Sequence, residues 1–296
     1  MTSFMPSDKT APWTIESVLR WASDDFLAKG IDSPRLDAEL LLAHALNTTR
    51  MQLILDAKKP LLPGELGRFR ALVKRRRARE PVAYLRGERE FFGRSFAVDA
   101  RVLVPRPDTE CLVTVALTRT RHCSMSMRAL DACTGSGCVA ITLAKERLTS
   151  HADATDVSPD ALAVAQHNAL RLGAYNVAFY EADLFPPHGH AYDIVVSNPP
   201  YIASSEIDTL MPEVSRFEPR IALDGGPDGL SFVRRLLEGG RSVLSQEGVL
   251  AIEVGDGQAP QVAALFEQNG YRDVECARDY GGIERVVSGV WYTPTK

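Results

Sequence analysis

The sequence predicts an α/β protein with a mostly parallel sheet, preceded by a small N-terminal helical domain. From residue 127 onward, short apolar runs alternate with amphipathic segments of helical length. Before residue 80, the apolar residues instead recur at three- and four-residue intervals, which is typical of helices alone. The alternation favours parallel strands, because each helix carries the chain back to the edge where the next strand begins.

The N-terminal helical domain is predicted to span residues 1–84. Thr14 can cap a first helix that Gly30 ends, and Ser33, followed by proline, marks the start of a second. A third helix ends before Pro81. Its charges form a basic cluster that is either a solvated face or a docking surface for an RNA-rich or acidic partner. The cluster consists of Arg68, Lys74, Arg75, Arg76, Arg77 and Arg79.

A β-hairpin linker is predicted over residues 85–105. Its strands are expected at 92–96 and 98–104, joined by a glycine turn. A stiff proline-rich connector follows, and Asp108 or Thr109 can cap the next helix. The boundary between the two domains is therefore expected within this hairpin.

The second domain is predicted to span residues 106–296. Only six residues separate the last two strands, too few for a parallel crossover, so the final strand is expected to pair antiparallel. Strands are expected at 128–132, 151–156, 176–182, 192–197, 248–254, 271–278 and 285–291, and helices at 138–148, 158–172, 229–244 and 258–269.

Composition excludes several classes of protein. Of the 296 residues, 45% are hydrophobic and 24% are charged, as in soluble globular proteins. A net charge of −4 argues against a surface that grips nucleic acid throughout. No apolar run approaches the roughly 20 residues that span a bilayer, and Met1–Thr10 lacks the apolar stretch of a secretory signal. Five cysteines without a C-x-x-C pair predict reduced thiols in the cytoplasm and no metal site.

A loop of small residues follows the first predicted strand and opens a helix. Small residues let the backbone approach a ligand closely, and the helix N-terminus favours polar groups. A dinucleotide site would carry G-x-G-x-x-G. Here cysteine stands at the first glycine position and the third glycine is missing, so the loop predicts a nucleoside ligand without phosphates, with a plain turn as the alternative. The loop consists of Cys133, Thr134, Gly135, Ser136 and Gly137.

Acidic residues end the next two predicted strands. Asp156 lies about twenty residues after the loop, where a carboxylate can accept both ribose hydroxyls. Alternatively, it caps the helix that begins at Ser158. Asp183 ends the third strand, where it suits an adenine amino group, with Leu184 beside the base. Alone, this second position is equally consistent with a surface acid.

The fourth predicted strand ends at Asn198-Pro199-Pro200-Tyr201. Two prolines cannot continue a sheet ladder. The side-chain oxygen of Asn198 and the carbonyl of Pro199 make a pair of acceptors that suits a planar NH2 group. Tyr201 can pack against that group, and Pro200 stiffens the corner. These residues predict a site for chemistry on the nitrogen of a planar amine or amide.

The order of these strand-end motifs resembles the class I S-adenosylmethionine methyltransferases, which have a Rossmann-like fold. This resemblance covers residues 105–296. The Asn-Pro-Pro-Tyr box is similar to the subset that methylates amino groups of nucleic-acid bases and the side chains of glutamine.

Further segments resemble the protein-(glutamine-N5) methyltransferases that modify peptide release factors, the PrmC or HemK family. The resemblance covers nearly the whole chain, including the helical N-terminal domain. Pro-Asp-Thr-Glu at 107–110 favours the release-factor branch, because the branch that acts on ribosomal protein L3 usually carries serine at residue 107. The segments are 80–87, 90–96, 104–110, 217–230 and 279–287.

The resemblance implies an enzyme that uses S-adenosyl-L-methionine to methylate the glutamine of the Gly-Gly-Gln motif in class-I peptide chain release factors. It implies that Asn198, which also contacts the cofactor, and Pro199 accept the two amide hydrogens, while Tyr201 packs on the amide and Pro200 borders it. The N-terminal domain would dock the release factor. The enzyme is expected to be a cytoplasmic monomer without direct contacts to nucleic acid or membrane.

Several alternatives stay open. Ribosomal protein L3 or a nucleic-acid amino group could be the substrate. A nicotinamide dehydrogenase and a non-catalytic module that uses the basic helix are rivals from other classes. Arg106 and Glu110 either close the pocket or form structural ion pairs. Cys133 replaces the glycine usual in the family, and we expect it to be tolerated if its φ is negative.

Overall fold

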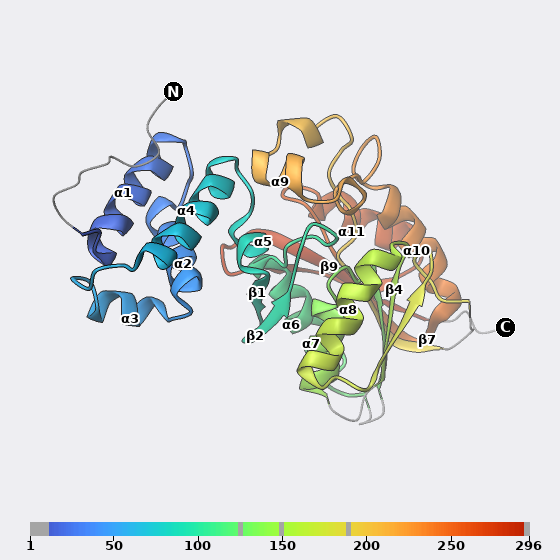
Figure 1. Cartoon of the computed structure of the whole chain (residues 1–296). Helices are drawn as coiled ribbons and strands as arrows, with labels where there is room; N and C mark the ends of the chain where they lie inside the picture. Colours follow the sequence, from blue (N-terminus) through green and yellow to red (C-terminus); the bar gives the residue numbers. More distant parts are fainter. Residues whose placement is uncertain (1–11, 124–126, 148–150, 188–190, 293–296) are drawn as a thin grey trace. The chain divides into compact units, whose positions relative to one another are not determined.

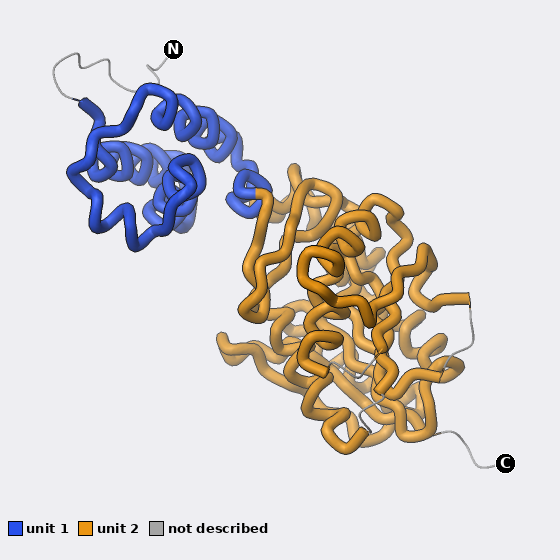
Figure 2. The backbone as a smooth tube through the Cα atoms, turned by 60° about the horizontal axis from the view of Figure 1, so that its bottom comes forward, with its two compact units in different colours: residues 1–86 blue, residues 87–296 orange. Residues whose placement is uncertain are grey.

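The structure, a computed structural model, describes residues 12–123, 127–147, 151–187 and 191–292. The chain divides into two compact units, Met1–Arg86 and Gly87–Lys296 (Figure 2). The segment predicted as a hairpin linker therefore falls almost entirely within the second unit. Residues Met1–Thr10, for which the sequence predicts no secretory signal, lie outside the described residues.

The first unit is a bundle of helices around its own apolar core. The three predicted helices are present as α1 (Ile15–Ala28), α2 (Pro34–Leu46) and α4 (Pro63–Arg77) (Figure 1). The shorter α3 (Arg50–Leu55) and α5 (Val82–Arg86) were not predicted, because six or five residues are too few to show a helical period. The fully buried side chains of the core include Val18, Phe26, Leu41, Leu42, Phe69 and Val73.

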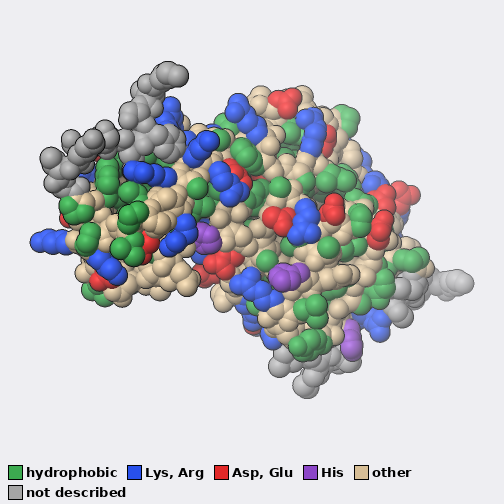
Figure 3. Space-filling model, viewed as in Figure 1, with side chains coloured by type: hydrophobic (Ala, Val, Ile, Leu, Met, Phe, Trp, Pro, Cys, Tyr) green, Lys and Arg blue, Asp and Glu red, His purple; other side chains and the backbone are tan. Residues whose placement is uncertain are grey.

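The basic cluster on α4 is largely engaged within the first unit. Arg76 is buried and pairs with Asp37 at 2.8 Å, and Arg75 pairs with Glu80 at 2.5 Å. On the face shown in Figure 3, basic side chains are scattered over the surface, and several lie next to acidic ones. These contacts favour an ion-paired surface over a docking site for an acidic partner. Arg77 also pairs with Asp25, whereas Arg68 and Arg79, which follows α4, donate to the carbonyls of Ala45 and Gly30.

The hairpin is present, but its strands differ from the prediction. β1 (Glu88–Phe91) pairs antiparallel with β2 (Arg94–Ala97), whereas residues 98–104, all described, form no strand. The placement of a strand at 98–104 was therefore wrong. Phe92 and Gly93 form the turn with φ values of 49° and 70°. Positive φ at both central residues is typical of tight hairpin turns, but phenylalanine is an unusual residue there, so the sequence signal is weak.

The hairpin is anchored to the second unit by packing and by hydrogen bonds. Phe91 and Phe96 lie edge to face, 6.0 Å apart, within the core of that unit. The buried side chain of Asn168 pairs with the backbone of Ala97 in the way that a neighbouring strand would. Its Oδ1 accepts from the Ala97 amide at 2.7 Å, and its Nδ2 donates to the Ala97 carbonyl at 3.0 Å. The hairpin is thus an integral part of the second unit.

The second unit contains a seven-stranded sheet in the order β5-β4-β3-β6-β7-β9-β8. The strands from β5 to β7 are parallel, and β9 is antiparallel to both of its neighbours. The predicted antiparallel pairing of the final strand is confirmed, and that strand inserts between β7 and β8. The strands are β3 (Arg128–Ala132), β4 (His151–Asp156), β5 (Val177–Glu181), β6 (Tyr192–Ser197), β7 (Leu244–Glu253), β8 (Arg272–Arg278) and β9 (Glu284–Trp291).

Helices contribute to two separate cores, one on each face of the sheet. Among the described helices, none has both the length and the apolar character needed to cross a membrane. One core contains α6 (Glu110–Arg119), α7 (Cys138–Glu146) and α8 (Pro159–Leu172), and the other contains α10 (Ser231–Val243) and α11 (Ala259–Gln268). The shorter elements are α9 (Pro212–Phe217) and the single turns η1 (Pro107–Thr109), η2 (Ile207–Thr209) and η3 (Arg220–Ala222).

The strand order reverses between β3 and β6. The chain runs outward from β3 through β4 to β5, then returns to the other side of β3 to form β6 and β7. The loops that follow β3 and β6 therefore turn in opposite directions. In open α/β sheets, such a reversal leaves a crevice at the carboxyl ends of the strands, where ligands bind.

Candidate active site

A cleft opens at the carboxyl ends of β3, β4 and β6, where the strand order reverses. Its empty space is about 940 Å³ when the open mouth is included. Gly137, Pro199 and Tyr201 are not among its lining residues. The other predicted site residues all line it: Cys133, Thr134, Gly135, Ser136, Asp156, Asp183, Leu184, Asn198 and Pro200.

The loop after β3 is held in a tight conformation by residues with positive φ. Gly135 has φ 53°, and a side chain added there would meet no atom within 4 Å, so its backbone is accessible to a ligand. A Cβ on Gly137 would lie 2.9 Å from Ile141 Cδ1, so this glycine permits close packing of α7. Cys133 has φ 62°. The negative φ under which we expected a side chain to be tolerated at this position is therefore not present. The conformation of Cys133 is thus strained for a residue with a side chain.

Asp131 anchors this loop from within the core. Its side chain is 2% exposed, and Oδ2 accepts hydrogen bonds from Thr134 Oγ1 at 2.7 Å and from the Ala140 amide at 3.0 Å. Burial raises the pKa of Asp131 to about 7 despite these two bonds. The carboxyl group thus ties the start of the loop to the first turn of α7.

Asp156 ends β4 and receives one backbone hydrogen bond on each oxygen. The Gly135 amide donates to Oδ2 and the Ser158 amide donates to Oδ1, both at 2.9 Å. Burial raises the pKa of Asp156, and the backbone donors oppose this effect. Ser158, whose side chain accepts from Ala161, is the residue that caps α8. Each Asp156 oxygen keeps a lone pair that a hydroxyl of a ligand can use.

Asp183 and Leu184 follow β5 at the rim of the cleft. The Asp183 side chain is 59% exposed and pairs with Arg235 at 2.7 Å, so one carboxylate oxygen is already engaged by an arginine. Leu184 is buried, with φ 70°, and its carbonyl accepts from Thr155 Oγ1 at 2.7 Å. Leu184 therefore has a fixed position in the cleft wall, whereas Asp183 lies at its solvent edge.

The side-chain amide of Asn198 is fixed by one hydrogen bond. Its Nδ2 donates to Thr109 Oγ1 at 3.1 Å, which leaves Oδ1 as an acceptor at the cleft. Pro199 is buried, and no hydrogen bond among the described residues uses its carbonyl oxygen. The amide oxygen and this carbonyl both lack a partner among the described residues, and their use as a pair of substrate acceptors stays a prediction.

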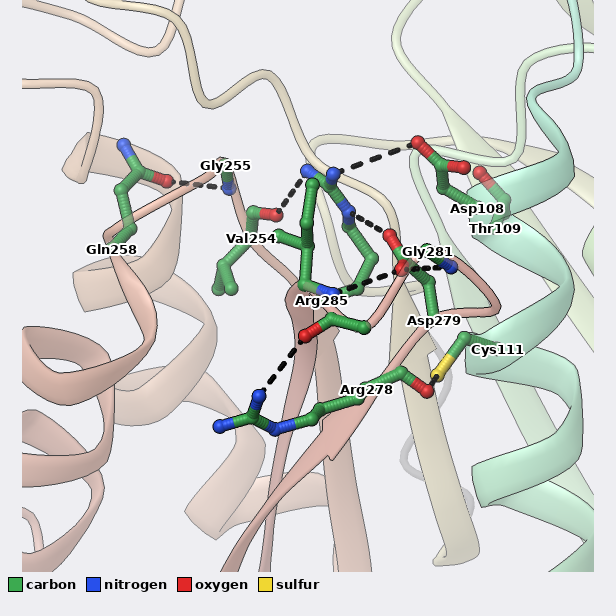
Figure 4. Close-up of polar contacts among 12 residues, drawn as sticks. Asp108, Thr109, Cys111, Val254, Gly255, Gln258, Arg278, Asp279, Gly281 and Arg285 are labelled. Atoms are coloured by element: carbon green, nitrogen blue, oxygen red, sulfur yellow. Dashed lines mark hydrogen bonds and ion pairs between the residues drawn. The ribbon is translucent and has the colours of Figure 1, made fainter.

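Tyr201 is held by its backbone beside the cleft. Its carbonyl accepts from Gln258 Nε2 at 2.9 Å, and Gln258 Oε1 in turn accepts from the Gly255 amide at 2.8 Å, a contact that Figure 4 shows. Burial raises the pKa of the Tyr201 hydroxyl, and the nearby Glu253 raises it further. The ring is therefore neutral over the ordinary pH range.

Glu253 is a buried carboxyl group at the end of β7, beside the end of β6. The register pairs Ile252 with Ser197, so Glu253 and Asn198 follow at equivalent positions of neighbouring strands. Glu253 is 1% exposed, and its Oε2 has no hydrogen-bond partner among the described residues. Burial raises its pKa to about 7, while Thr109, Arg285 and Tyr201 lower it. Both hydroxyls favour the carboxylate form of Glu253.

Arg285 connects the turn before α6 to the last hairpin of the sheet (Figure 4). Its Nη2 lies 3.6 Å from Asp108 Oδ2, its Nε donates to Asp279 Oδ2 at 3.2 Å, and its Nη1 donates to the Val254 carbonyl at 3.4 Å. Asp279 Oδ1 also accepts from the Gly281 amide at 2.8 Å. These contacts hold η1, and therefore Thr109, next to the strand ends.

The open question about Arg106 and Glu110 resolves differently for each residue. Arg106 lines the cleft, and its Nη2 donates to both oxygens of the buried Glu218 at 2.7 and 2.9 Å. Arg106 therefore forms an ion pair with Glu218 and is also part of the wall of the cleft. Glu110 is not a lining residue, because its Oε1 accepts from the Phe92 amide at 2.8 Å and ties α6 to the hairpin turn.

The cleft fits a nucleoside-type cofactor such as S-adenosylmethionine. Gly135 leaves open space over the loop backbone, Asp156 keeps acceptor capacity on both oxygens, and Leu184 offers an apolar wall. A carboxylate with free lone pairs suits vicinal hydroxyls, and the loop provides no third glycine for a pyrophosphate. The residues present are therefore consistent with a ligand that carries a ribose and a planar base.

Thr109 and Glu253 were not predicted as site residues. Thr109 was predicted as a possible helix cap and noted as part of the Pro-Asp-Thr-Glu segment, and its side chain makes no cap bond in the structure. Glu253 satisfies the criterion that identified Asp156 and Asp183, because it is an acid at the end of a parallel strand. Applying that criterion to the strand at 248–254 would have found it. Other lining residues outside the predicted motifs include Arg101, Val102, Leu103, Pro219, Ala222 and Phe232.

Comparison with known proteins defines the class first. The methyltransferase small domain matches residues 109–214 and the PrmC N-terminal domain matches residues 17–87. The catalytic domain of hMettl16, solved in complex with a MAT2A 3'UTR hairpin, has a TM-score of 0.57. It covers 69% of this chain and 77% of its own chain at 16% identity, which shows the fold. The second unit is a class I methyltransferase domain.

Full-length relatives then define the family. The release factor glutamine methyltransferase of Geobacter sulfurreducens is 43% identical over 284 residues, which cover 96% of this chain and 99% of that protein. The proteins of the same name from Chlorobaculum tepidum and Rhodopirellula baltica are 40% and 42% identical, and the matches cover 96% and 94% of this chain and 99% and 96% of theirs. The chain belongs to the release factor glutamine methyltransferase family.

Proposed function

We propose that this protein transfers a methyl group from S-adenosylmethionine to the side-chain amide nitrogen of the glutamine in the Gly-Gly-Gln motif of class-I peptide chain release factors. Membership of the family supports the substrate class. The observation that carries the chemistry is the Asn198 side chain, whose Nδ2 is engaged by Thr109 while Oδ1 remains an acceptor at the cleft.

The acceptor pair is proposed to position the substrate amide. A glutamine amide nitrogen is a weak nucleophile, because its lone pair is delocalised into the carbonyl. Asn198 Oδ1 and the Pro199 carbonyl accept its two hydrogens, which orients the nitrogen and favours a more pyramidal geometry. Correct placement of two reactants can contribute roughly 7–11 kcal/mol to catalysis. Asn198 and Pro199 therefore act as catalytic residues through position rather than through proton transfer.

The loop after β3 and the acids at the strand ends are proposed to hold the cofactor. When bound, S-adenosylmethionine supplies an electrophilic methyl group on a sulfonium centre. Residues 133–137 pass beneath it, Asp156 accepts from the ribose hydroxyls, and Asp183 with Leu184 borders the adenine. Asp183 keeps one oxygen free of its Arg235 contact for the base. Asn198, which lines the same cleft, lies between the two ligands.

The remaining residues of the corner are proposed to shape the substrate pocket. Tyr201 packs against the amide plane, and Pro200 keeps the corner stiff. Gln258 holds the Tyr201 backbone, so this role does not depend on the phenol. The reaction needs no general base, since an N-methylated amide loses its extra proton readily to water. This is consistent with a neutral Tyr201, whose pKa is raised by burial.

The first unit is proposed to dock the body of the release factor, because a single glutamine offers too little surface for specificity. The ion-paired arginines of α4 argue against an electrostatic mode of docking. A release factor acts on the ribosome, so we place the reaction in the cytoplasm. We propose that the enzyme works as a monomer.

Label transfer tests the proposed function. Purified enzyme and tritiated S-adenosylmethionine are offered a class-I release factor, ribosomal protein L3 and DNA in parallel reactions. We expect tritium in the release factor, within the peptide that contains the Gly-Gly-Gln motif. A release factor with glutamine changed to alanine at that motif is the matched control and should remain unlabelled. Label in L3 or DNA with none in the release factor would reject the proposal.

A further inference from the structure

We propose that Thr109 and Glu253 form a relay that determines which way round the Asn198 amide lies, and hence whether Asn198 presents an acceptor to the substrate. This inference rests on the proposed function, because it assigns positioning roles to two residues behind a proposed catalytic one. Neither Thr109 nor Glu253 belongs to the motifs from which the sequence predicts the site.

The first step is the ambiguity of the amide itself. An asparagine side chain is nearly symmetric in shape, and a half-turn exchanges its acceptor oxygen with its donor nitrogen. Only the oxygen-outward orientation can accept a hydrogen from a substrate amide. Asn198 therefore needs a neighbour that accepts from its nitrogen and refuses to donate to its oxygen.

Thr109 is that neighbour. Its Oγ1 lies 3.1 Å from Asn198 Nδ2, and its side chain is 2% exposed, so water does not compete for the contact. A hydroxyl group can both donate and accept. Thr109 alone would tolerate either orientation of the Asn198 amide, so a further group must receive the hydroxyl hydrogen.

Glu253 is placed to be that further group. It ends β7 at the position equivalent to Asn198 at the end of β6, and Oε2 has no hydrogen-bond partner among the described residues. The Thr109 hydroxyl stabilises the carboxylate form of Glu253. When Glu253 is ionised it can only accept, so the Thr109 hydrogen turns toward it. The oxygen of Thr109 is then left to accept from Asn198 Nδ2, which directs Asn198 Oδ1 into the cleft.

Protonation of Glu253 would remove the preference for the orientation that directs Asn198 Oδ1 into the cleft. A neutral carboxyl group can donate to Thr109 Oγ1, and the hydroxyl hydrogen of Thr109 can then turn toward Asn198. Burial raises the pKa of Glu253 to about 7, so the change falls within an accessible pH range. The other groups that interact with Glu253 are a cation, an acid, a phenol and two thiols. The phenol and thiols stay neutral there, because burial raises the pKa of each. They are Arg285, Asp108, Tyr201, Cys111 and Cys138.

The test is the pH profile of kcat for the full-length enzyme with a class-I release factor and saturating tritiated S-adenosylmethionine. For the wild type, we expect kcat to rise with pH as Glu253 loses its proton near pH 7. In Glu253→Gln, we expect kcat to be lowered about tenfold, the rate equivalent of one hydrogen bond, and the rise near pH 7 to be absent. Asp131 also titrates near 7, so only the variant assigns the rise to Glu253.

Thr109→Val and Thr109→Ser test the other half of the relay. Valine has the shape of threonine without the hydroxyl, and we expect kcat to fall about tenfold with the KM for release factor and the Kd for cofactor unchanged. Serine keeps the hydroxyl and should restore kcat. The matched control is Thr114→Val in α6, an exposed threonine outside the cleft, which should behave as wild type. Thermal unfolding of each variant identifies any that fails to fold.

Three outcomes would overturn the inference. One is a wild-type kcat that is flat between pH 6 and about 8.5. Another is a Glu253→Gln variant that keeps the rise near pH 7, and a third is a folded Thr109→Val variant with the kcat of wild type. If Asn198→Ala is inactive in the same assay, such a result removes the relay but leaves the proposed function intact. If Asn198→Ala turns over like wild type, both fail.

Discussion

The two halves of the cleft differ in how completely their polar groups are used. After β3 and β4, Asp131 and Asp156 each receive two hydrogen bonds from nearby protein groups. After β6 and β7, Asn198 makes one hydrogen bond, while the Pro199 carbonyl and Glu253 Oε2 have none among the described residues. The first half is thus preformed, whereas the second keeps acceptors available. We propose that the first half binds the cofactor and that the second half positions the reacting nitrogen.

Removing the Asn198 acceptor from the second half of the cleft should have the largest effect on the rate of methyl transfer. Asn198→Ala is expected to lower kcat by about a hundredfold or more, as for loss of a group that orients or stabilises the reacting centre. The Kd for S-adenosylmethionine, measured by calorimetry, should change little. Asn269→Ala is the matched control, because Asn269 makes one local bond to the Leu265 carbonyl away from the cleft. Wild-type turnover by Asn198→Ala would refute the acceptor pair.

Changing the first half should affect binding instead. Asp156→Ala is expected to raise the Kd for S-adenosylmethionine about 10- to 100-fold, the equivalent of hydrogen bonds to a charged group. Asp156→Asn keeps the shape and one acceptor oxygen, so it should have an intermediate Kd. An unchanged Kd in the alanine variant, measured by calorimetry, would show that Asp156 does not hold the ribose.

The buried acid of the second half should also influence stability. Burial raises the pKa of Glu253 from 4.5 to about 7, so the folded state holds its proton more tightly than the unfolded state. Stability from this group is complete below pH 4.5 and is lost as pH rises through 7, by up to about 3 kcal/mol. Glu253→Gln lacks this loss. The free energy of unfolding is measured for both proteins by urea titration from pH 5 to about 8.5. The value for Glu253→Gln should increase relative to that of wild type as pH rises.

Parallel free-energy curves for Glu253→Gln and wild type would contradict this expectation. Asp131, whose pKa is also about 7, contributes the same trend to both proteins and cancels in the difference. The comparison therefore isolates the acid at the end of β7.

The smallest effect is expected at Cys133, in the preformed half. Its φ of 62° costs a residue with a side chain roughly 1–2 kcal/mol, whereas glycine adopts this conformation freely. Cys133→Gly should therefore stabilise the protein by up to about 1 kcal/mol, since greater freedom of the unfolded chain offsets part of the gain. Thermal unfolding would show a raised midpoint, with Cys133→Ala as the matched control that retains the strain. A lower midpoint in the glycine variant would contradict the account.

The central strands β3, β6 and β7 could be predicted because they are largely buried on both faces and therefore appear as apolar runs. The antiparallel final strand followed from a short connection. The hairpin strands could not be placed in this way. β1 carries the polar sequence Glu-Arg-Glu-Phe, and its turn places Phe92 at a positive φ where asparagine or glycine would signal a hairpin. The partner strand β2 is anchored through Ala97 by Asn168, which is distant in sequence.

The site was predictable where a motif is continuous in sequence. Thr109 and Glu253 were missed because their relation to Asn198 exists only after β6 and β7 are adjacent. The ion pairs of the basic helix were likewise invisible, since Asp25 and Asp37 lie in other helices. The strain at Cys133 could not be foreseen, because φ is set by the path of the loop rather than by the residue type.

The central claim is that the cleft separates binding from positioning, and single-turnover methyl transfer at saturating S-adenosylmethionine tests it most directly. Excess enzyme, preloaded with cofactor, is mixed with release factor, and the rate of label transfer is measured for wild type, Asp156→Ala and Asn198→Ala. The account predicts that saturation returns Asp156→Ala to near the wild-type rate, while Asn198→Ala stays slow. Recovery of Asn198→Ala, or a persistent defect in fully loaded Asp156→Ala, would contradict it.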